Sequence, residues 1–378
     1  MRDKKMQNRI TLFLGIFLSF GMVAGLVSPL LLSQQNLNPA QTRPTNTPRP
    51  TQPAPPDVST INFDQTYLHP SGLFTAAIPT NYLLSNEFNS SSEAQVTMEN
   101  SAALSVLEIR VIRPTLEASL DSPQNLGEIF NTEWLRSSWS RYSSWSEDAR
   151  RVEGEQLVID FSLTRGGQDY AARQVAFTDG TWIYMIRVVA PSNASEVIQY
   201  VLENEVASFQ PVERFVGSPL EWNGYFDDTS DHLVRFPGDW QVVDAVDGAP
   251  ASIAGPNAQL RIETIDASID TAEAAEAYVA GLRSNITVLS SEAVELDGNA
   301  GFRVAYTQST VDGATQSGVV QFITVGDTTH VINVLLTDVA DTDFNTVDVE
   351  AEGANLAIVD ALSVLNTFSL FPALELGS

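Results

Sequence analysis

The chain of 378 residues is strongly acidic, because 47 Asp and Glu residues outnumber 20 Lys and Arg residues and give a formal net charge of −27. It contains no cysteine, which excludes disulfides, thiol nucleophiles and cysteine metal sites. So negative a chain repels nucleic-acid phosphates, and we expect no nucleic-acid partner. Lys4 and Lys5 are its only lysines. The chain after residue 5 therefore cannot use lysine Schiff-base chemistry or form a phosphate-binding P-loop, which requires a lysine.

The N-terminus combines a basic stretch with a long apolar run. Residues 1–9 contain several basic side chains, and residues 10–32 contain no charged one. About 20 helical residues cross a bilayer core, and a basic N-terminal flank stays in the cytoplasm. We therefore predict a cytoplasmic tail over 1–9 and a single-pass transmembrane signal-anchor over 10–33. The membrane would be a partner through this helix, and the bulk of the chain would be extracytoplasmic, at the cell surface or in the periplasm.

Two further features of this segment leave alternatives open. Val23-Ala24-Gly25 has the small residues of a signal-peptide cleavage site, and cleavage there would make the protein secreted. Gly21 and Gly25 have the GxxxG spacing that lets two membrane helices approach closely, which would support a homodimer. Residues 34–60 follow as a Pro/Thr-rich linker, for which we expect an extended conformation because proline disrupts helices and strand ladders.

The remainder divides into two segments with the same internal order, module one (61–214) and module two (222–372). Each module has an apolar-Pro-x-x-aromatic step near its start, at Ile78-Pro79 to Tyr82 and at Phe236-Pro237 to Trp240. Each also ends with a phenylalanine, Phe209 or Phe368, and the distance along the chain between the two copies is nearly the same for the step and for the phenylalanine. A shared offset at both ends indicates an internal duplication.

Each module is predicted to contain a strand, a helix, three strands with tight turns and a closing amphipathic helix. In module one the first helix is expected to begin at Ser122 and continue to Trp134. Thr178-Asp179-Gly180 and Val311-Asp312-Gly313 lie between β-branched runs and are hairpin signals. Helices before and after antiparallel strands predict an α+β fold class, in which each of the tandem modules is an antiparallel sheet covered by helices.

This order, with the apolar-Pro-x-x-aromatic step and the helix ending at Ser208-Phe209 or Thr367-Phe368, resembles the PsbP family of extrinsic photosystem II proteins and their bacterial relatives. The resemblance implies an α-β-α sandwich for each module. It also implies an exported binding or assembly role, and it transfers no metal-binding or photosystem-docking residue to this chain.

Module one carries aromatic residues interleaved with arginines, the residue types that dominate interface hot spots. The candidate ligand- or partner-binding residues are Trp139, Tyr142, Trp145, Arg136 and Arg141. An envelope protein or a glycan would be the partner. The alternative is that the aromatic side chains only cover the sheet.

One acidic stretch of module two has calcium-loop spacing. Asp341, Asp343, Asn345 and Glu352 would occupy positions one, three, five and twelve of an EF-hand loop. Thr346 stands where the sharp turn requires glycine, so a solvated acidic loop is the alternative. Calcium is the one cofactor that the sequence suggests.

No catalytic residues are assigned. The chain has three histidines, His69, His232 and His330, and no G-x-S-x-G nucleophile motif. We expect a membrane-anchored, extracytoplasmic, non-enzymatic binding or assembly protein. The alternatives are an extracytoplasmic hydrolase that uses paired carboxylates, and a calcium- or ligand-responsive surface sensor.

Overall fold

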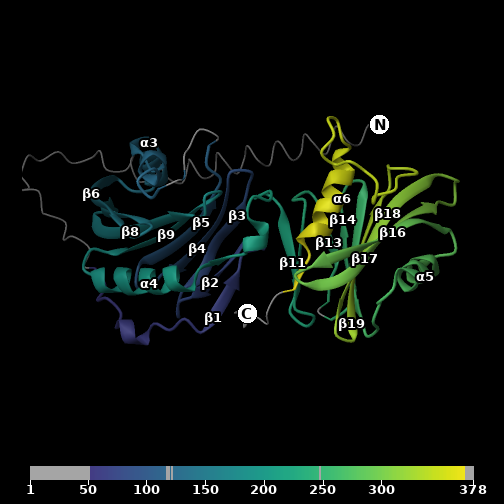
Figure 1. The fold of residues 1–378 in the computed structure, drawn as a ribbon. Helices are drawn as coiled ribbons and strands as arrows, with labels where there is room; N and C mark the ends of the chain where they lie inside the picture. The colour runs from purple at the N-terminus through teal and green to yellow at the C-terminus, as the bar shows by residue number, and fades with distance from the viewer. Residues whose placement is uncertain (1–51, 116–119, 121, 247, 371–378) are drawn as a thin grey trace, which may run out of the picture. The chain divides into compact units, whose positions relative to one another are not determined.

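The computed structural model describes residues 52–115, 120, 122–246 and 248–370 (Figure 1). The described residues are 46% strand and 17% helix, and they include two seven-stranded sheets. The predicted α+β class is therefore wrong, and the fold is mainly β. The tail, the predicted signal-anchor and residues 34–51 of the linker lie outside the described residues. Within the described ranges, no helix has the length and apolarity that a membrane crossing needs.

Module one is built on an antiparallel sheet in the order β3-β4-β5-β9-β8-β7-β6. Its strands are β3 (Leu83–Asn89), β4 (Glu93–Asn100), β5 (Ser105–Ile112), β6 (Ser144–Glu153), β7 (Gln156–Arg165), β8 (Gln168–Thr178) and β9 (Ile183–Pro191). A smaller sheet has the order β1-β2-β10, from β1 (Gln65–Leu68), β2 (Phe74–Ile78) and β10 (Gln210–Pro211). The short 3-10 helix η1 (Val58–Thr60) precedes it, and η2 (Glu213–Phe215) follows.

Module two repeats this topology, with the order β13-β14-β15-β19-β18-β17-β16 and a smaller sheet β11-β12-β20. The large sheet consists of β13 (Gln241–Asp244), β14 (Ala251–Ala254), β15 (Ala258–Ile265), β16 (Ile286–Leu296), β17 (Asn299–Ser309), β18 (Thr315–Val325) and β19 (Thr328–Leu336). The smaller one consists of β11 (Asn223–Asp227), β12 (His232–Phe236) and β20 (Ser369–Leu370). The two large sheets have matching strand orders, as a tandem arrangement requires.

Local sequence explains the hairpins and the helices of module one. The Asp179 carboxylate accepts hydrogen bonds from the backbone N–H groups of Thr181 and Trp182, both at 2.8 Å, and so fixes the β8–β9 turn. The segment expected to form one helix instead forms α2 (Leu126–Ile129) and α3 (Thr132–Ser138). Asn131 starts the second helix, because its side chain accepts hydrogen bonds from the N–H groups of Glu133 and Trp134.

The two faces of the module one sheet are covered differently. Helix α4 (Ser195–Ser208) lies on one face and α3 on the other (Figure 1). Val197, Ile198 and Val201 of α4 are buried in a core that also contains Leu107 and Ile109 of β5. On the α3 side the apolar cluster draws on β7, β8 and β9, with Leu135 and Trp139 over it. Strands β3 and β4 contribute no residue to this apolar cluster. The part of the face formed by these two strands carries the site described below.

Module two uses α5 (Ala272–Leu282) and α6 (Leu356–Thr367) in the corresponding places. Ala275 and Val279 of α5 are buried against Val304, Val320 and other apolar residues of its large sheet. The opposite face is buried against Ile358, Leu362 and Leu365 of α6.

Candidate functional site

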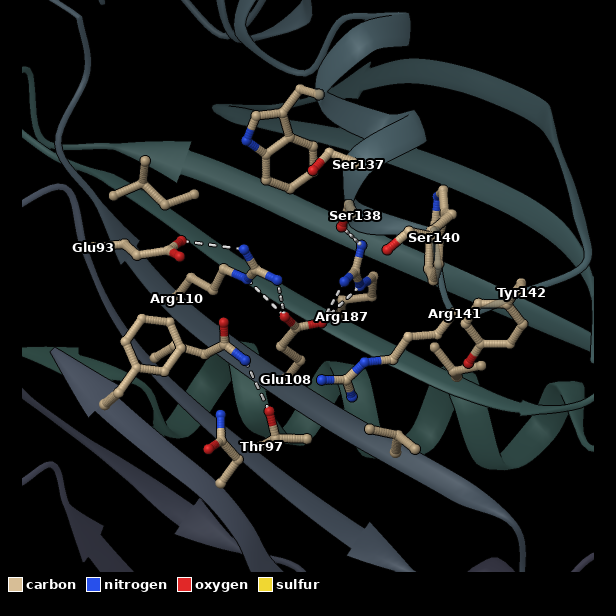
Figure 2. Close-up of a pocket in the computed structure, with 18 of the residues that line it drawn as sticks. Glu93, Thr97, Glu108, Arg110, Ser137, Ser138, Ser140, Arg141, Tyr142 and Arg187 are labelled. Atoms are coloured by element: carbon tan, nitrogen blue, oxygen red, sulfur yellow. Dashed lines mark hydrogen bonds and ion pairs between the residues drawn. The ribbon is translucent and has the colours of Figure 1, made fainter. Parts of the chain in front are cut away.

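A polar groove of about 530 Å³ lies on the α3 side of the module one sheet (Figure 2). Strands β4, β5 and β9 supply its floor, and the end of α3 with the following turn supplies one wall. The rim on the other side comes from β3, through Asn86 and Phe88. The groove lies at the part of the face where helices do not cover the sheet.

The floor is crossed by a row of polar side chains on neighbouring strands, which we call the polar row. Its members stand directly opposite one another in the sheet register: Asn86, Thr97, Glu108, Arg187 and Gln174. Of these, Thr97, Glu108, Arg187 and Gln174 are buried. Buried polar groups are costly unless they are paired, so the partners of these side chains are informative.

Glu108 is held between two arginines (Figure 2). Its carboxylate accepts a hydrogen bond of 2.6 Å from Arg110 Nε and one of 3.0 Å from Arg187 Nε. Burial opposes ionisation of Glu108, but the charges of Arg187 and Arg110 outweigh it and lower the pKa of this carboxyl below its usual value. Glu93 adds a second carboxylate to Arg110 at 3.1 Å. The four side chains form one charge-compensated network.

Arg187 is enclosed beneath Trp139. Its side chain is 3% exposed, its guanidinium lies 4.0 Å from the Trp139 ring centroid, and Nη1 donates to Ser138 Oγ at 2.8 Å. Burial is the main reason that the pKa of Arg187 is lowered. Next to it, both polar atoms of the Gln174 amide, and Trp139 Nε1 above the sheet, have no hydrogen-bond partner among the described residues. Paired charges at the inner end of the groove therefore lie next to unsatisfied neutral groups, of which Trp139 lines the groove and Gln174 is the neighbour of Arg187 on β8.

The remaining cations of the groove are unpaired within the part of the chain that the structure describes. Five arginines and three glutamates line it, in a chain whose net charge is −27. Arg113, Arg141 and Arg165 have no side-chain ion pair or hydrogen bond within the described residues. In Figure 2 the Arg141 side chain reaches from the wall across the groove toward Glu108 and Thr97. The groove is thus locally positive in an acidic protein.

The structure brings only part of the predicted binding segment to this groove. Trp139, Tyr142 and Arg141 line it, whereas Arg136 and Trp145 do not. Trp139 is 1% exposed, so it forms a wall of the groove instead of an open contact surface. Sequence reasoning missed Glu108, Arg110 and Arg187. Their signal was the presence of charged residues inside the apolar runs that became β5 and β9.

The predicted calcium ligands make other contacts. The Asp343 carboxylate accepts hydrogen bonds from Ser290 Oγ at 2.6 Å and from the Asn345 N–H at 3.1 Å, and Asn345 Nδ2 donates to Ser290. In the described parts of the chain, no three His, Asp or Glu side chains are grouped so that they could hold a metal ion. Calcium binding by Asp341, Asp343, Asn345 and Glu352 stays a prediction that this arrangement does not favour.

The three histidines are buried structural groups. His69 Nδ1 lies 2.7 Å from Ser71 Oγ, but its Nε2 faces the Gln95 carbonyl at 3.2 Å in place of the carboxylate of a catalytic triad. Burial lowers the pKa of His69 to about 4. His232 and His330 lie near each other in module two, with ring centroids 5.5 Å apart.

No family model matches the chain, and no curated protein matches it. Among solved structures, it is similar to the cyanobacterial PsbP protein CyanoP from Synechocystis sp. PCC 6803, with 14% identity and a TM-score of 0.31 over 40% of this chain and 92% of that one. It is also similar to the immunity protein TplEi of Pseudomonas aeruginosa in complex with a peptide, with 9% identity and a TM-score of 0.22 over 84% of this chain and 100% of that one. The Tle4–Tli4 complex gives 10% identity and a TM-score of 0.23 over 84% and 99%. TM-scores below 0.5 assign the chain to none of these families.

Proposed function

We propose that the chain is an extracytoplasmic, non-enzymatic binding or assembly protein, and that the groove of module one binds an anionic ligand carried by an envelope partner. The observation that carries this proposal is the gathering of five arginines in one groove, three of them without a side-chain partner among the described residues, within a strongly acidic chain. Arginine presents a planar fork of donors that matches a carboxylate, which makes unpaired arginines in a groove a natural anion site.

The charges of the groove favour binding over hydrolysis. A hydrolase that works through paired carboxylates needs one of them protonated near neutral pH to act as the general acid. Glu108 has a lowered pKa, and Glu93 is ion-paired with the same Arg110. Both carboxylates are therefore suited to holding arginines in place.

The proposed location rests on the sequence. The basic side chains within residues 2–9 and the uncharged run of residues 10–32 are typical of an exported chain. Fractionation of the native cell tests this part, since recovery of the intact chain from the cytosol would contradict it.

Binding is tested by titrating the full-length chain with hexaglutamate blocked at both ends, while following tryptophan fluorescence. We expect saturable binding that weakens between 0.05 and 0.5 M NaCl, because salt screens exposed charge pairs. Arg141→Gln should weaken binding at least fivefold. The matched control is Arg136→Gln, because Arg136 belongs to α3 but does not line the groove.

Two results would contradict the proposal. One is the absence of saturable binding to wild-type protein. The other is an equal loss of affinity in Arg136→Gln and Arg141→Gln, which would indicate attraction by overall charge in place of a site.

A further inference from the structure

We infer that β3, the edge strand of the module one sheet beside the groove, pairs with an acidic β-strand of a partner protein. This inference rests on the proposed function and specifies its ligand. It follows from three observations: the free edge of β3, the position of that edge at the rim of the groove, and the direction of the Arg141 side chain.

Strand β3 leaves one edge of its sheet open. Within the described residues it pairs with β4 alone, and its residues 83–88 are all exposed. The side chain of its last residue, Asn89, donates to the Trp222 carbonyl at 3.0 Å, so the open part of the edge ends there. An edge strand of this kind offers backbone groups to which another strand can bond.

The opposite edge of the same sheet is protected by charge. Strand β6 carries five charged residues, Glu147, Asp148, Arg150, Arg151 and Glu153. Charged side chains along an edge discourage pairing with another strand. In β3, the register shifts between Leu84 and Asn86, and the regular part that follows, residues 86–89, has Glu87 as its single charged residue. The edge at β3 therefore lacks the protection that β6 has.

The backbone groups of Glu87 point outward from this edge. The Ser90 N–H donates to the Glu93 carbonyl at 2.8 Å, so these two residues form a hydrogen-bonded pair at the turn between β3 and β4. Bonded and non-bonded pairs alternate along antiparallel strands, so Phe88 and Asn86 bond to β4 and Glu87 does not. The N–H and C=O of Glu87 are therefore directed toward the place of a further strand.

The side chains of β3 place this edge at the rim of the groove. Asn86 and Phe88 line the groove. Glu87, between them, points to the other side of the sheet, where its carboxylate accepts a hydrogen bond of 3.0 Å from the Tyr67 hydroxyl. Side chains alternate between the two faces of a sheet, so every second side chain of an added strand would stand beside the groove.

The direction of Arg141 favours acidic residues at those positions. Its side chain reaches from the wall across the groove toward Glu108 and Thr97 (Figure 2). Thr97 stands opposite Asn86 in the register, so Arg141 extends along the polar row toward the open edge. An added strand would lie two strand spacings from β4, about 10 Å, a gap that a glutamate and an arginine side chain close together.

The corresponding edge of module two shows that an open edge does not by itself select an acidic strand. Strand β13 is exposed at all four residues and carries Val242 and Val243. Neither β13 nor its neighbour β14 contains a basic residue, and β13 includes Asp244. We therefore expect an acidic strand to pair with module one and not with module two.

The test titrates the full-length chain with the blocked peptide Ac-EVEVEV-NH2, while following tryptophan fluorescence. Its valines favour an extended strand, and its glutamates share one face. We expect this peptide to bind at least fivefold more tightly than blocked hexaglutamate, because backbone pairing adds to charge. The neutral analogue Ac-QVQVQV-NH2 should bind at least fivefold more weakly than Ac-EVEVEV-NH2.

Two N-methylated forms of Ac-EVEVEV-NH2 test the backbone pairing on the wild-type protein. One form is methylated on the three glutamate nitrogens and the other on the three valine nitrogens. Alternate residues of a strand direct their N–H groups to opposite edges, so only one of these two sets faces β3. One form should lose at least tenfold in affinity, and the other should stay within twofold of the unmethylated peptide.

A pair of variants tests the strand itself. Glu87→Pro removes an outward N–H and no bond to β4, and should weaken binding of Ac-EVEVEV-NH2 at least fivefold. Glu87→Gln removes the same charge but keeps the N–H, and should not weaken binding. Val243→Pro, on the exposed edge of module two, should leave binding unchanged.

The outcomes separate this inference from the function on which it rests. If hexaglutamate binds, equal losses in the two N-methylated forms, equal affinity for the neutral peptide, or undiminished binding to a folded Glu87→Pro would each overturn the inference and leave an anion-binding groove. Failure of both Ac-EVEVEV-NH2 and hexaglutamate to bind would overturn the inference and the proposed function together.

Discussion

The α3 side of module one and the α5 side of module two are built on the same strand order but differ in chemistry. In module two, Val331 and Leu335 of β19 are buried with Val320 and Phe322 of β18. In module one, the adjacent central strands β5 and β9 carry Glu108, Arg110 and Arg187. Module two also has a charged pair on this side, Arg261 and Glu263 of β15, but Arg261 is 54% exposed.

The difference indicates that the charged floor is specific to module one and is not required by the fold. The strands of module two that correspond to β5 and β9 are β15 and β19, and there the arginine of the charged pair is largely exposed, so a sheet of this topology forms without a buried arginine on that side. A buried ion pair is weak evidence for stability, because removing charges from water offsets most of their attraction. The charged network in module one is therefore better explained by a binding role than by folding.

The largest expected effect concerns the buried pair. Glu108→Gln leaves Arg187, 3% exposed, without a carboxylate, and should lower the free energy of unfolding by about 3–5 kcal/mol. Glu263→Gln is the control in module two and should cost less than about 1 kcal/mol, since its partner Arg261 is solvated. Chemical denaturation measures both. Similar costs at the two sites would remove the distinction between the modules.

The second effect is a pH dependence in module two. Burial, and then the neighbouring His330, lower the pKa of His232 to about 4, below the ordinary value of 6.5. The unfolded chain therefore takes up a proton that the folded chain does not, and stability falls as the pH drops from 6.5 toward 4. Between pH 7.5 and pH 5, His232 alone should account for a loss of about 2 kcal/mol. Chemical denaturation at both pH values should show that the free energy of unfolding of His232→Phe falls by about 2 kcal/mol less than that of the wild-type protein. An equal fall in the two proteins would refute the role of His232.

The third and smallest effect compares corresponding positions of the closing helices. Glu205 and Val364 each stand four residues before the phenylalanine that follows the helix, and both are 0% exposed. Neither carboxyl oxygen of Glu205 has a hydrogen-bond partner among the described residues, and burial raises its pKa well above the usual value. In the folded protein the Glu205 carboxyl keeps its proton, whereas in the unfolded chain it loses the proton once the pH exceeds the ordinary pKa of a glutamate. Glu205 therefore destabilises the folded state more and more as the pH rises.

Replacing Glu205 by the module two residue, Glu205→Val, should therefore stabilise the protein at pH 7.5 by about 1–3 kcal/mol. The gain should shrink at pH 4.5, where the carboxyl is protonated in the folded state and partly so in the unfolded chain. Thermal unfolding of the two proteins at both pH values measures this. A destabilised variant at pH 7.5 would mean that the Glu205 carboxyl has a partner that compensates for its burial.

Parts of the fold were predictable because their signals are local. The hairpins around Asp179 and Asp312, and the closing helices α4 and α6, follow from turn residues and helical periodicity close together in the chain. The fold class was missed partly because of strands such as β3, whose residues from Leu83 to Phe88 are all exposed and show no alternation. An edge strand of this kind is defined by its neighbour, β4, and not by its own pattern.

The site was predictable only in part, for the same reason. The aromatic and arginine-rich segment includes Arg141 and Tyr142, which line the groove, and their role in binding stays a prediction. The floor depends on Glu108 and Arg187, which are 79 residues apart and meet through the pairing of β5 with β9. Charged residues within two otherwise apolar strands were the available signal, but only the register shows that they form one pair.

The account's central claim is that the unpaired arginines of module one form an anion-binding groove. The most direct measurement is the NMR spectrum of the arginine side-chain Nε–Hε groups in the full-length chain, recorded during titration with hexaglutamate blocked at both ends. We predict saturable shifts at Arg113, Arg141 and Arg165, with Arg136 unmoved. Shifts spread evenly over all arginines, or none at these three, would contradict the claim.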